Sequence, residues 1–333
     1  MNEKDKLKFG RLTDLFERNF KITRLYADYL ERYPEVITKE MIDTLTEDGE
    51  IGKEEALVAI LSEIFALNFE DPSDRILIRD YLTPSVRLLD SEKYKNDPYY
   101  KKIKINDLKS GNWELKSECY PAYRGVIAGD MIMGGDFSEI PPLGFFTEDF
   151  HFPAVLENGN EWMTLTPVDL DTCEDAIARA HGKVVTFGLG LGYYAYMASE
   201  KEEVESVTVV ELSEDVIRLF KENILPQMEH REKIRIVCAD AFEYAENVMP
   251  KEKFDVAFVD TWRDASDGAP MYKRMKALES LSPDTEFLYW IENFLISRLR
   301  AERFSKIYDK IETNAKDAPE SYEEITDSLL NLS

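Results

Sequence analysis

Residues 184–192 read VVTFGLGLG, a short apolar run that leads into three glycines at alternate positions. The apolar run predicts a buried β-strand, and the glycines predict a tight turn that opens a helix at Tyr193. Glycines let a ligand approach the backbone without a Cβ in the way, and a helix start offers free N–H groups to an anion. A purely structural turn is the alternative for this stretch taken alone. The spacing differs from the G-x-G-x-x-G of a dinucleotide site, so it favours a ligand that carries a carboxylate over one that carries a pyrophosphate.

Strands and helices alternate around this stretch, from Thr166 onward. Apolar runs predict five strands, at 184–187, 207–211, 234–238, 256–259 and 287–290. Amphipathic patterns predict helices at 166–180, 193–201, 214–224, 242–248, 272–278 and from about 293. Short apolar strands separated by such helices predict an α/β fold, with a doubly wound parallel sheet and helices on both faces.

Acidic residues end the second and third predicted strands. Glu211 lies 19 residues after Gly192 and could accept hydrogen bonds from both hydroxyls of a ribose. Asp240 ends the third strand and could accept a hydrogen bond from an adenine amino group, with Ala241 and Phe242 beside the ring. A helix N-cap is the structural alternative for Asp240, and the two roles are compatible. For Phe242, a role in anchoring the helix is equally consistent.

The fourth predicted strand ends at Asp260, followed by Trp262 and Asp264. In open α/β sheets, ligands bind outside the carboxyl ends of the strands. We therefore expect Asp260, together with Asp264, to orient an amine or hydroxyl nucleophile and to take its proton, with Trp262 as a wall of the pocket. A surface ion pair of Asp264 with Arg263 is the structural alternative.

The order of glycine turn, Glu211, Asp240 and Asp260 resembles the class I S-adenosylmethionine-dependent methyltransferases, over about 125 residues. The resemblance implies a Rossmann-like sheet of strand order 3-2-1-4-5 and S-adenosylmethionine as cofactor, with S-adenosylhomocysteine as product. It implies that the cofactor's methionine end lies over the glycines, its ribose at Glu211, its adenine at Asp240 and its sulfonium near Asp260. The expected cofactor-binding residues are Gly188, Leu189, Gly190, Gly192, Glu211, Leu212, Asp240, Ala241, Phe242 and Asp260.

The same region is similar to the spermidine synthase branch of that superfamily, in which a β-hairpin precedes the helix that leads into the glycines. Asn158-Gly159 is the matching hairpin turn here, between strands expected at 154–157 and 161–165. Leu191 stands where polyamine synthases carry an aspartate, and three residues separate Asp260 from Asp264 where the branch has D-x-x-D. Methyl transfer is therefore the primary expectation, and aminopropyl transfer is the alternative.

Thr186 stands where many methyltransferases carry an acid before the first glycine. We expect another acid, Asp169 or Asp171, to serve the cofactor's amino group instead. Further residues from the hairpin and from the aromatic segment before it are expected to cover the substrate pocket. The candidates are Tyr123, His151, Glu161 and Trp262.

Four segments are expected along the chain. They are a helical N-terminal domain at 1–104, a strand-containing connector with the hairpin at 105–165, the methyltransferase-like domain at 166–313 and an acidic tail at 314–333. A third reading of the function follows from the helical domain. The chain would be a non-catalytic protein that binds S-adenosylmethionine and docks a partner on those helices. Exposed aromatic residues in the same helices suit a homodimer interface.

The charge balance narrows the partners. There are 66 acidic and 41 basic residues among 333, a formal net charge of −25. Such a surface repels phosphate backbones and anionic lipid, so a small molecule or a protein is expected as substrate, and nucleic acid and membranes are not. The three cysteines form no C-x-x-C pair, and no metal-ligand cluster is visible. A charged start without an apolar core predicts a cytoplasmic protein.

Overall fold

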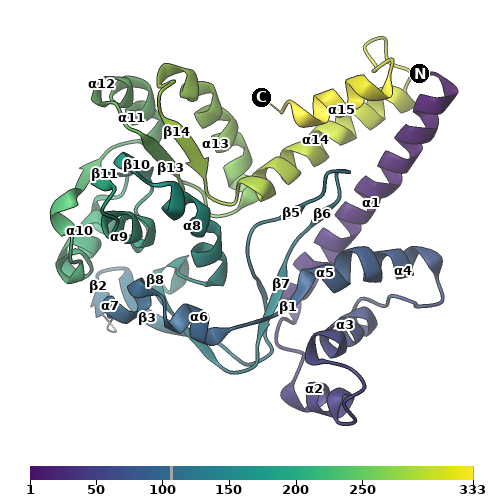
Figure 1. Cartoon of the computed structure of the whole chain (residues 1–333), viewed down its shortest axis with the longest axis horizontal. Helices are drawn as coiled ribbons and strands as arrows, with labels where there is room; N and C mark the ends of the chain where they lie inside the picture. Colours follow the sequence, from purple (N-terminus) through teal and green to yellow (C-terminus); the bar gives the residue numbers. More distant parts are fainter. Residues whose placement is uncertain (106–107, 333) are drawn as a thin grey trace. The chain divides into compact units, whose positions relative to one another are not determined.

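The computed structural model describes residues 1–105 and 108–332. The chain divides into two compact units (Figure 1). Unit 1 contains Met1–Leu89, Pro121–Glu148 and Glu292–Ser333, and unit 2 contains Asp90–Tyr120 and Asp149–Ile291. These units cut across the four segments expected from the sequence. Each of the expected N-terminal and connector segments divides its residues between the two units.

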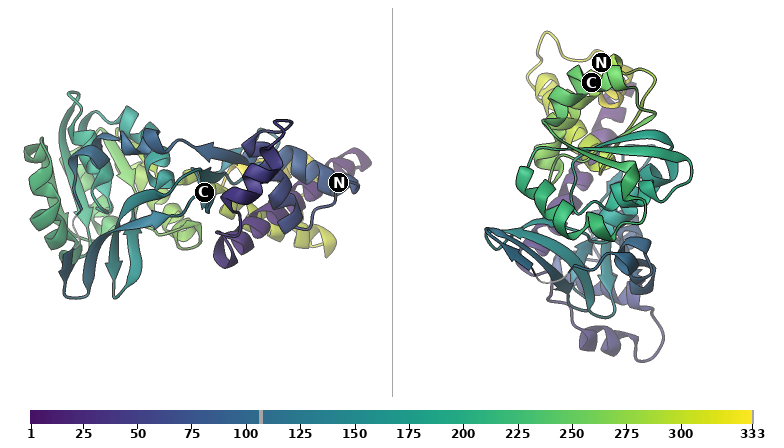
Figure 2. Two further views of the ribbon diagram at one scale, coloured as in Figure 1. Left: turned by 90° about the horizontal axis from the view of Figure 1, so that it is seen from below. Right: turned by 90° about the vertical axis from the view of Figure 1, so that its left-hand side faces the viewer.

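Unit 2 is built on a five-stranded parallel sheet, so the expected α/β class with a parallel sheet is confirmed (Figures 1 and 2). The strands stand in the order β12-β11-β10-β13-β14, with every neighbouring pair parallel. Their bounds are β10 (Gly182–Phe187), β11 (Val204–Glu211), β12 (Ile234–Cys238), β13 (Val256–Val259) and β14 (Glu286–Tyr289). Because crossovers between parallel strands are right-handed, the reversal of strand order at β10 places the connecting helices on opposite faces.

Helices and 3-10 turns connect the strands of this sheet, with α8 packed beside α9 and α11 beside α13. Their bounds are α8 (Pro167–Arg179), α9 (Tyr193–Ser199), α10 (Glu214–Asn223), η2 (Leu225–Gln227), η3 (Arg231–Lys233), α11 (Ala241–Asn247), α12 (Met249–Glu252), α13 (Ala265–Leu278) and η4 (Glu279–Leu281). Helix α13 begins seven residues before the start expected at Tyr272. A capping box at Asp264 and Asp267 starts this helix, although it contains Gly268 and Pro270.

An antiparallel sheet and two short helices complete unit 2. The sheet has the order β2-β3-β8-β9 and contains the expected hairpin, since Glu157 pairs with Asn160 across the turn. Asn158 and Gly159 both have positive φ, as this tight turn requires. The bounds are α6 (Ser91–Lys95), α7 (Pro98–Lys102), β2 (Leu108–Ser110), β3 (Trp113–Tyr120), β8 (Phe150–Glu157) and β9 (Asn160–Thr164).

Unit 1 is mainly helical. Its helices are α1 (Glu3–Arg32), α2 (Lys39–Thr46), α3 (Lys53–Ile64), α4 (Pro72–Leu77), the π-helical turn η1 (Ile78–Leu82), α5 (Thr83–Ser85), α14 (Glu292–Glu312) and α15 (Tyr322–Leu330). Its strands are β1 (Val86–Leu89), β4 (Gly125–Ile127), β5 (Ile132–Met133), β6 (Glu139–Ile140) and β7 (Leu143–Phe146). They form a three-stranded sheet of order β1-β7-β4 and a separate β5-β6 pair.

The last residues are not the weakly patterned tail expected from the sequence. Helix α15 is capped by Ser321 and buries Ile325 and Leu329 in a core shared with Phe9 on α1 and Phe304 on α14. Burial of these two aliphatic side chains stabilises a helix that is too short to persist alone in water.

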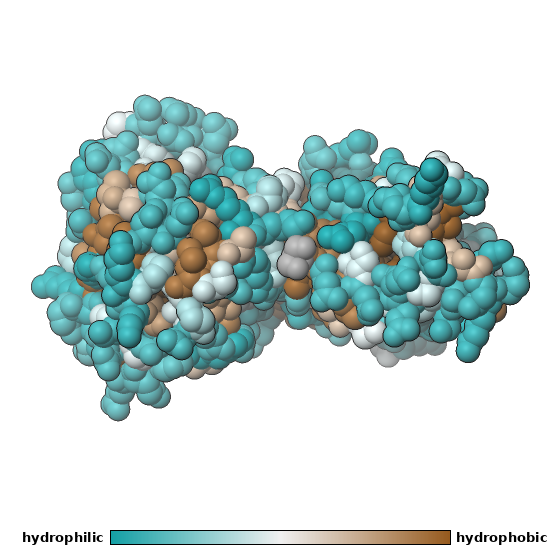
Figure 3. All heavy atoms as spheres, turned by 90° about the horizontal axis from the view of Figure 1, so that it is seen from above, coloured by the Kyte–Doolittle hydropathy of each residue, from teal (hydrophilic) through white to brown (hydrophobic). Residues whose placement is uncertain are grey.

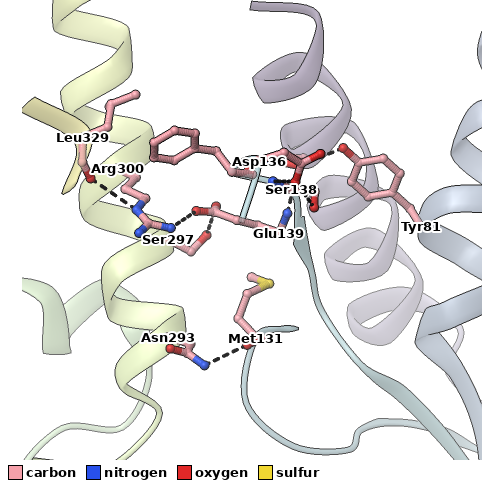
Figure 4. A network of polar contacts seen from close by, with 11 residues as sticks. Tyr81, Met131, Asp136, Ser138, Glu139, Asn293, Ser297, Arg300 and Leu329 are labelled. Atoms are coloured by element: carbon pink, nitrogen blue, oxygen red, sulfur yellow. Dashed lines mark hydrogen bonds and ion pairs between the residues drawn. The ribbon is translucent and has the colours of Figure 1, made fainter. Parts of the chain in front are cut away.

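A polar network at the buried Glu139 also joins the segments of unit 1 (Figure 4). The carboxylate of Glu139 accepts from Ser297 Oγ at 2.6 Å and from Arg300 Nη1 at 3.3 Å. The side chain of Asn19 accepts from Tyr81 and from the backbone N–H of Glu139. Burial raises the pKa of Glu139, and its bonds with Ser297 and Arg300 oppose that rise. The network thus satisfies polar groups that would be costly to bury alone.

Hydrophilic residues cover most of the face of the molecule shown in Figure 3. Within residues 1–105 and 108–332, none of the helices combines the length and the apolar character that crossing a bilayer requires.

Candidate cofactor and substrate site

A cavity of about 470 Å³ lies at the carboxyl ends of the parallel strands of unit 2. Four consecutive strand ends contribute to its lining: Gly188–Leu191 after β10, Glu211–Leu212 at β11, Ala239–Phe242 after β12 and Asp260–Arg263 after β13. The volume is in the range of pockets that hold a cofactor-sized ligand. The sheet therefore brings the glycine turn and the predicted acids of three further strands to one place.

The glycine turn packs directly against the end of β13. Gly188 has φ +99°, and a Cβ at this position would lie 1.9 Å from the backbone oxygen of Asp260. Gly192 has φ +76°, and a Cβ there would lie 2.2 Å from the ring of Phe220. Glycine is thus required at both positions for two reasons, the left-handed backbone and the close approach of another segment. The turn holds its backbone against the sheet and leaves the cavity side open.

Glu211 ties the glycine turn to the next strand. Its Oε2 accepts from the backbone N–H of Leu189 at 3.1 Å, and its Oε1 accepts from the N–H of Ser213 at 2.8 Å. Each carboxylate oxygen has a second lone pair, so Glu211 can still accept from the hydroxyls of a ribose. Leu212, which follows it, is 68% exposed and also lines the cavity. Exposure of so large an apolar side chain at a cavity wall suits contact with a flat ring.

Asp240 is both a helix cap and a cavity residue. Its Oδ1 accepts from the N–H groups of Phe242 and Glu243, both at 2.9 Å, and so caps α11. No donor to Oδ2 is found in the part of the chain that the structure describes, so this oxygen can accept a further hydrogen bond. The buried ring of Phe242 lies under the guanidinium of Arg274, 4.0 Å from the ring centroid. The structural and ligand-binding roles of this segment are therefore compatible.

Asp260 and Asp169 place two carboxyl groups deep in the same cavity. Burial, followed by the negative charges of Asp169 and Glu211, raises the pKa of Asp260 to about 8. Burial also raises the pKa of Asp169 to about 6, although hydrogen bonds from Thr166 oppose that rise. Asp260 in the ligand-free protein is therefore largely protonated at neutral pH. A carboxyl group with a pKa near the working pH is suited to proton transfer.

Several aromatic residues wall the cavity. Trp262 is 5% exposed and stacks with Tyr289, and its Nε1 has no acceptor among the described residues. Tyr194 is 6% exposed and stacks on Phe258 with ring centroids 4.2 Å apart. Both residues line the cavity. These walls present aromatic surface to the cavity and leave a buried donor on Trp262 for a ligand.

The hairpin supplies residues that sequence reasoning did not single out. Trp162 and Met163 of β9 line the cavity. Trp162 is 44% exposed and meets Trp113 of β3 edge-on, with ring centroids 5.5 Å apart. A Cβ on Gly190 would lie 3.0 Å from the sulfur of Met163, so the hairpin passes close to the glycine turn. The signal for these residues in the sequence is their place in the hairpin, which was expected to help cover the pocket.

Helix α7 supports the glycine turn from the other side. The fully buried Tyr99 donates its hydroxyl to the backbone oxygen of Leu191 at 2.6 Å. Asp97, the N-cap of α7, accepts from the hydroxyl of Tyr193 at 3.0 Å. These bonds hold the turn and the start of α9 in place, and nothing in the sequence pattern around Tyr99 indicates them.

The structure does not bring the remaining predicted residues into the cavity lining. Asp264 is exposed and caps α13 by accepting from the N–H and hydroxyl of Ser266, which lowers its pKa. His151 and Glu161 are exposed on β8 and β9. Tyr123 belongs to unit 1, where it is buried in the helical core. Of the two acids proposed for the cofactor's amino group, Asp169 lines the cavity, and Asp171 bonds Lys93 and Tyr94.

In residues 1–105 and 108–332, no group of three or more His, Cys, Asp or Glu side chains is placed to hold a metal ion.

Comparisons with known proteins give similarity at the level of structure. No family model matches the chain, and no curated protein matches it. The chain is similar to the crystal structure of spermidine synthase from Thermotoga maritima, with 15% sequence identity and a TM-score of 0.32. The match covers 61% of this chain and 65% of the length of that protein.

Proposed function

We propose that this chain is a class I S-adenosylmethionine-dependent methyltransferase that acts on an amine or hydroxyl of a small molecule or a protein. One observation carries the proposal. A glycine turn and acids from three further strands line a single cavity at the carboxyl edge of a parallel sheet of order β12-β11-β10-β13-β14. Counted from β10 as the first strand, this order is 3-2-1-4-5, which supports a Rossmann-like sheet with its ligand at the point where the order reverses.

The lining residues fit the cofactor in separate parts. The glycine turn offers bare backbone to the methionine end, because Gly188 and Gly190 bring no side chain into the cavity. Glu211 has acceptor capacity left for ribose hydroxyls, and Asp240 keeps Oδ2 for an adenine amino group. Leu212 and Phe242 supply apolar surface on which an adenine ring can pack.

When bound, the cofactor supplies an electrophilic methyl carbon. The task of the protein is then to align a nucleophile and to keep water away from it. Asp260 would accept a hydrogen bond from the amine or hydroxyl and take its proton. The bond between the nucleophile and the methyl carbon would form as the carbon–sulfur bond of the sulfonium breaks, and S-adenosylhomocysteine would leave. Trp262 and Tyr194 form apolar walls beside it, so the transferred group meets the nucleophile rather than water. Asp264 has no part in this mechanism, because it is exposed and caps a helix.

The test is turnover together with cofactor binding in two variants. Asp260→Asn keeps the shape of the side chain and removes the base, so it should leave binding of S-adenosylhomocysteine within about twofold and depress methyl transfer at least about 100-fold. Asp264→Asn is the matched control and should change neither. Unchanged turnover in Asp260→Asn would remove Asp260 from the mechanism.

Aminopropyl transfer is the second candidate, and the charge of the cavity favours it. Arg263 is the one cationic side chain in the lining that the structure describes, and it is 79% exposed and paired with Asp267. Four carboxyl groups line the same cavity, from Asp169, Glu211, Asp240 and Asp260. A decarboxylated cofactor, which lacks the negative group, meets less repulsion there. The two functions are separated by the thermal stabilisation that each cofactor form gives at equal concentration, because the tighter ligand raises the melting temperature more.

A further inference from the structure

We propose that Asp169 is the residue of this cavity that binds an ammonium group, across from Asp260. This inference rests on the proposed function, since it concerns the ligands of the same cavity. The ammonium has two chemically equivalent sources, the α-amino group of the cofactor and an acceptor amine, and the experiment below distinguishes them.

The position of Asp169 is fixed by the start of helix α8. Its Oδ2 accepts from both the backbone N–H and the hydroxyl of Thr166, at 2.7 and 2.8 Å. The side chain is therefore held in one orientation by a capping box. No donor to Oδ1 is found in the described part of the chain, so one oxygen remains free on a carboxyl group that lines the cavity. An anchored acid with a free oxygen is ready to bind a donor without an ordering cost.

The titratable groups around Asp169 are mainly acidic, which favours the binding of a cation. Beyond the effect of burial, the negative charges of Asp169 and Glu211 raise the pKa of Asp260, and those of Asp260 and Asp169 raise the pKa of the Cys173 thiol. The titratable or charged groups of the described lining are Asp169, Cys173, Tyr193, Tyr194, Glu211, Asp240, Asp260 and Arg263. The cation in this set, Arg263, is turned to solvent and to Asp267. A ligand ammonium would therefore supply the missing positive charge.

A second observation independently indicates a polar ligand. The indole N–H of Trp262 is buried in the wall of the cavity and has no acceptor among the described residues. A buried donor without a partner costs free energy, and a ligand that carries an acceptor removes that cost. The site therefore suits a ligand that presents an ammonium group and, near it, a hydrogen-bond acceptor.

A purely structural role for Asp169 does not require its burial. Two other helices in the described chain carry an acid at the same position nearer to solvent: Glu55 of α3 is exposed, and the side chain of Asp267 of α13 is 36% exposed. There the acid accepts from backbone N–H groups and keeps part of its hydration. Burial of the corresponding acid in the cavity raises the pKa of Asp169 and destabilises its ionised form. A bound cation offsets that cost.

The experiment compares Asp169→Asn with the wild-type protein and with Asp171→Asn. Asparagine retains an oxygen that can cap α8 and loses the charge, so the fold should persist and its melting temperature checks this. Asp171→Asn changes the same helix away from the cavity, where Asp171 binds Lys93 and Tyr94. Calorimetry then uses three probes: S-adenosylhomocysteine, 5′-methylthioadenosine, which lacks the amino-acid end, and 1,4-diaminobutane added to protein saturated with methylthioadenosine.

Two results support the proposal and identify the source of the ammonium. If Asp169 binds the cofactor's amino group, Asp169→Asn lowers the affinity for S-adenosylhomocysteine by about 10- to 100-fold and leaves the affinity for methylthioadenosine unchanged. If Asp169 binds the acceptor amine, both nucleosides bind to Asp169→Asn as they do to the wild type, and the affinity for the diamine falls by a similar factor. In either case the wild type should release a proton on binding at pH 7, seen as a buffer-dependent heat, because the cation lowers the pKa values of the paired acids.

Two other results overturn it. Equal affinities of the wild type and Asp169→Asn for all three probes would remove Asp169 as an ammonium site and leave the proposed function standing. A wild-type protein that binds neither nucleoside would overturn the proposed function and this site together.

Discussion

Gly188 and Asp260 are in backbone contact, since a Cβ on Gly188 would lie 1.9 Å from the carbonyl oxygen of Asp260. The first strand of the sheet ends at Phe187 and the fourth at Val259, and the N–H of Asp260 donates to the oxygen of Phe187 at 2.8 Å. The glycine turn and the buried acid are therefore one structural unit. Any change that moves the turn also moves the proposed base.

The first prediction concerns this contact. Gly188→Ala combines a left-handed backbone with a clash against main-chain atoms, which cannot move away as a flexible side chain can. We expect a loss of about 3 kcal/mol in the free energy of unfolding, measured by urea titration. Gly10→Ala is the matched control, because nothing lies within 4 Å of its Cβ position in α1. That variant should be more stable than wild type by about 0.5 to 1 kcal/mol. Equal effects of the two substitutions would contradict the contact.

The second prediction concerns Glu211. Its carboxylate accepts from the N–H groups of Leu189 and Ser213, and a ribose would add two charge-assisted hydrogen bonds. Glu211→Gln should lower the affinity for S-adenosylhomocysteine, measured by calorimetry, by about 10- to 100-fold. Glu205 is exposed at the other end of the same strand, so the control variant Glu205→Gln should leave the affinity unchanged. A similar loss in both variants would indicate a general effect of charge on the strand rather than contact with the ligand.

The third prediction concerns pH and stability. The pKa of Asp260 is raised from its ordinary value of 3.8 to about 8 by burial and by Asp169 and Glu211. Between those values the folded protein binds more protons at this residue than the unfolded chain does. The free energy of unfolding of the ligand-free protein should therefore fall as pH rises from about 4 to about 8, by on the order of a few kcal/mol. Asp260→Asn should flatten that decline, and an equally steep decline in the variant would assign it to other groups.

The fourth prediction concerns pH and turnover. Asp260 acts as a base only when it is ionised, so kcat/KM should rise with pH and level off at or below about pH 8, because a bound ammonium lowers the pKa of Asp260 from about 8. The measurement is methyl transfer across pH 6 to 9.5 at subsaturating acceptor. An acceptor amine also titrates, so an alcohol acceptor, where one is found, provides the cleaner profile. A flat profile over this range would show that proton transfer to Asp260 does not limit the reaction.

The fifth prediction separates Asp264 from the mechanism. Asp264→Ala removes the N-cap of α13 and should cost about 1 kcal/mol of stability. Turnover at a temperature well below the transition should stay within about twofold of wild type. A loss of turnover as large as that in Asp260→Asn would bring Asp264 back into the site.

The sequence predicts the parallel strands well because each is a short apolar run bordered by local turn signals. The strand predicted at 184–187 and the glycines after it match β10 and the turn that follows it. The acids at strand ends are local signals too, and parallel pairing alone brings Glu211, Asp240 and Asp260 to one edge. These parts of the site depend on little beyond the order of residues along the chain.

The rest of the cavity depends on contacts between distant segments. Trp162 and Asp169 reach it because the hairpin and α8 fold back over the sheet, and Tyr99 reaches the glycine turn from another helix. An aspartate three residues before Asp267 is also a capping signal, and Asp264 caps α13 in the structure. Tyr123 lies in an aromatic segment whose residues divide between the two units. Such outcomes are set by packing, which no local pattern reports.

The most direct test of the whole account is calorimetry of the purified wild-type protein with S-adenosylhomocysteine, repeated with Glu211→Gln. We expect saturable binding close to one ligand per chain in the wild type, and an affinity at least about tenfold lower in Glu211→Gln. An absence of binding heat in the wild type, across several temperatures, would contradict it.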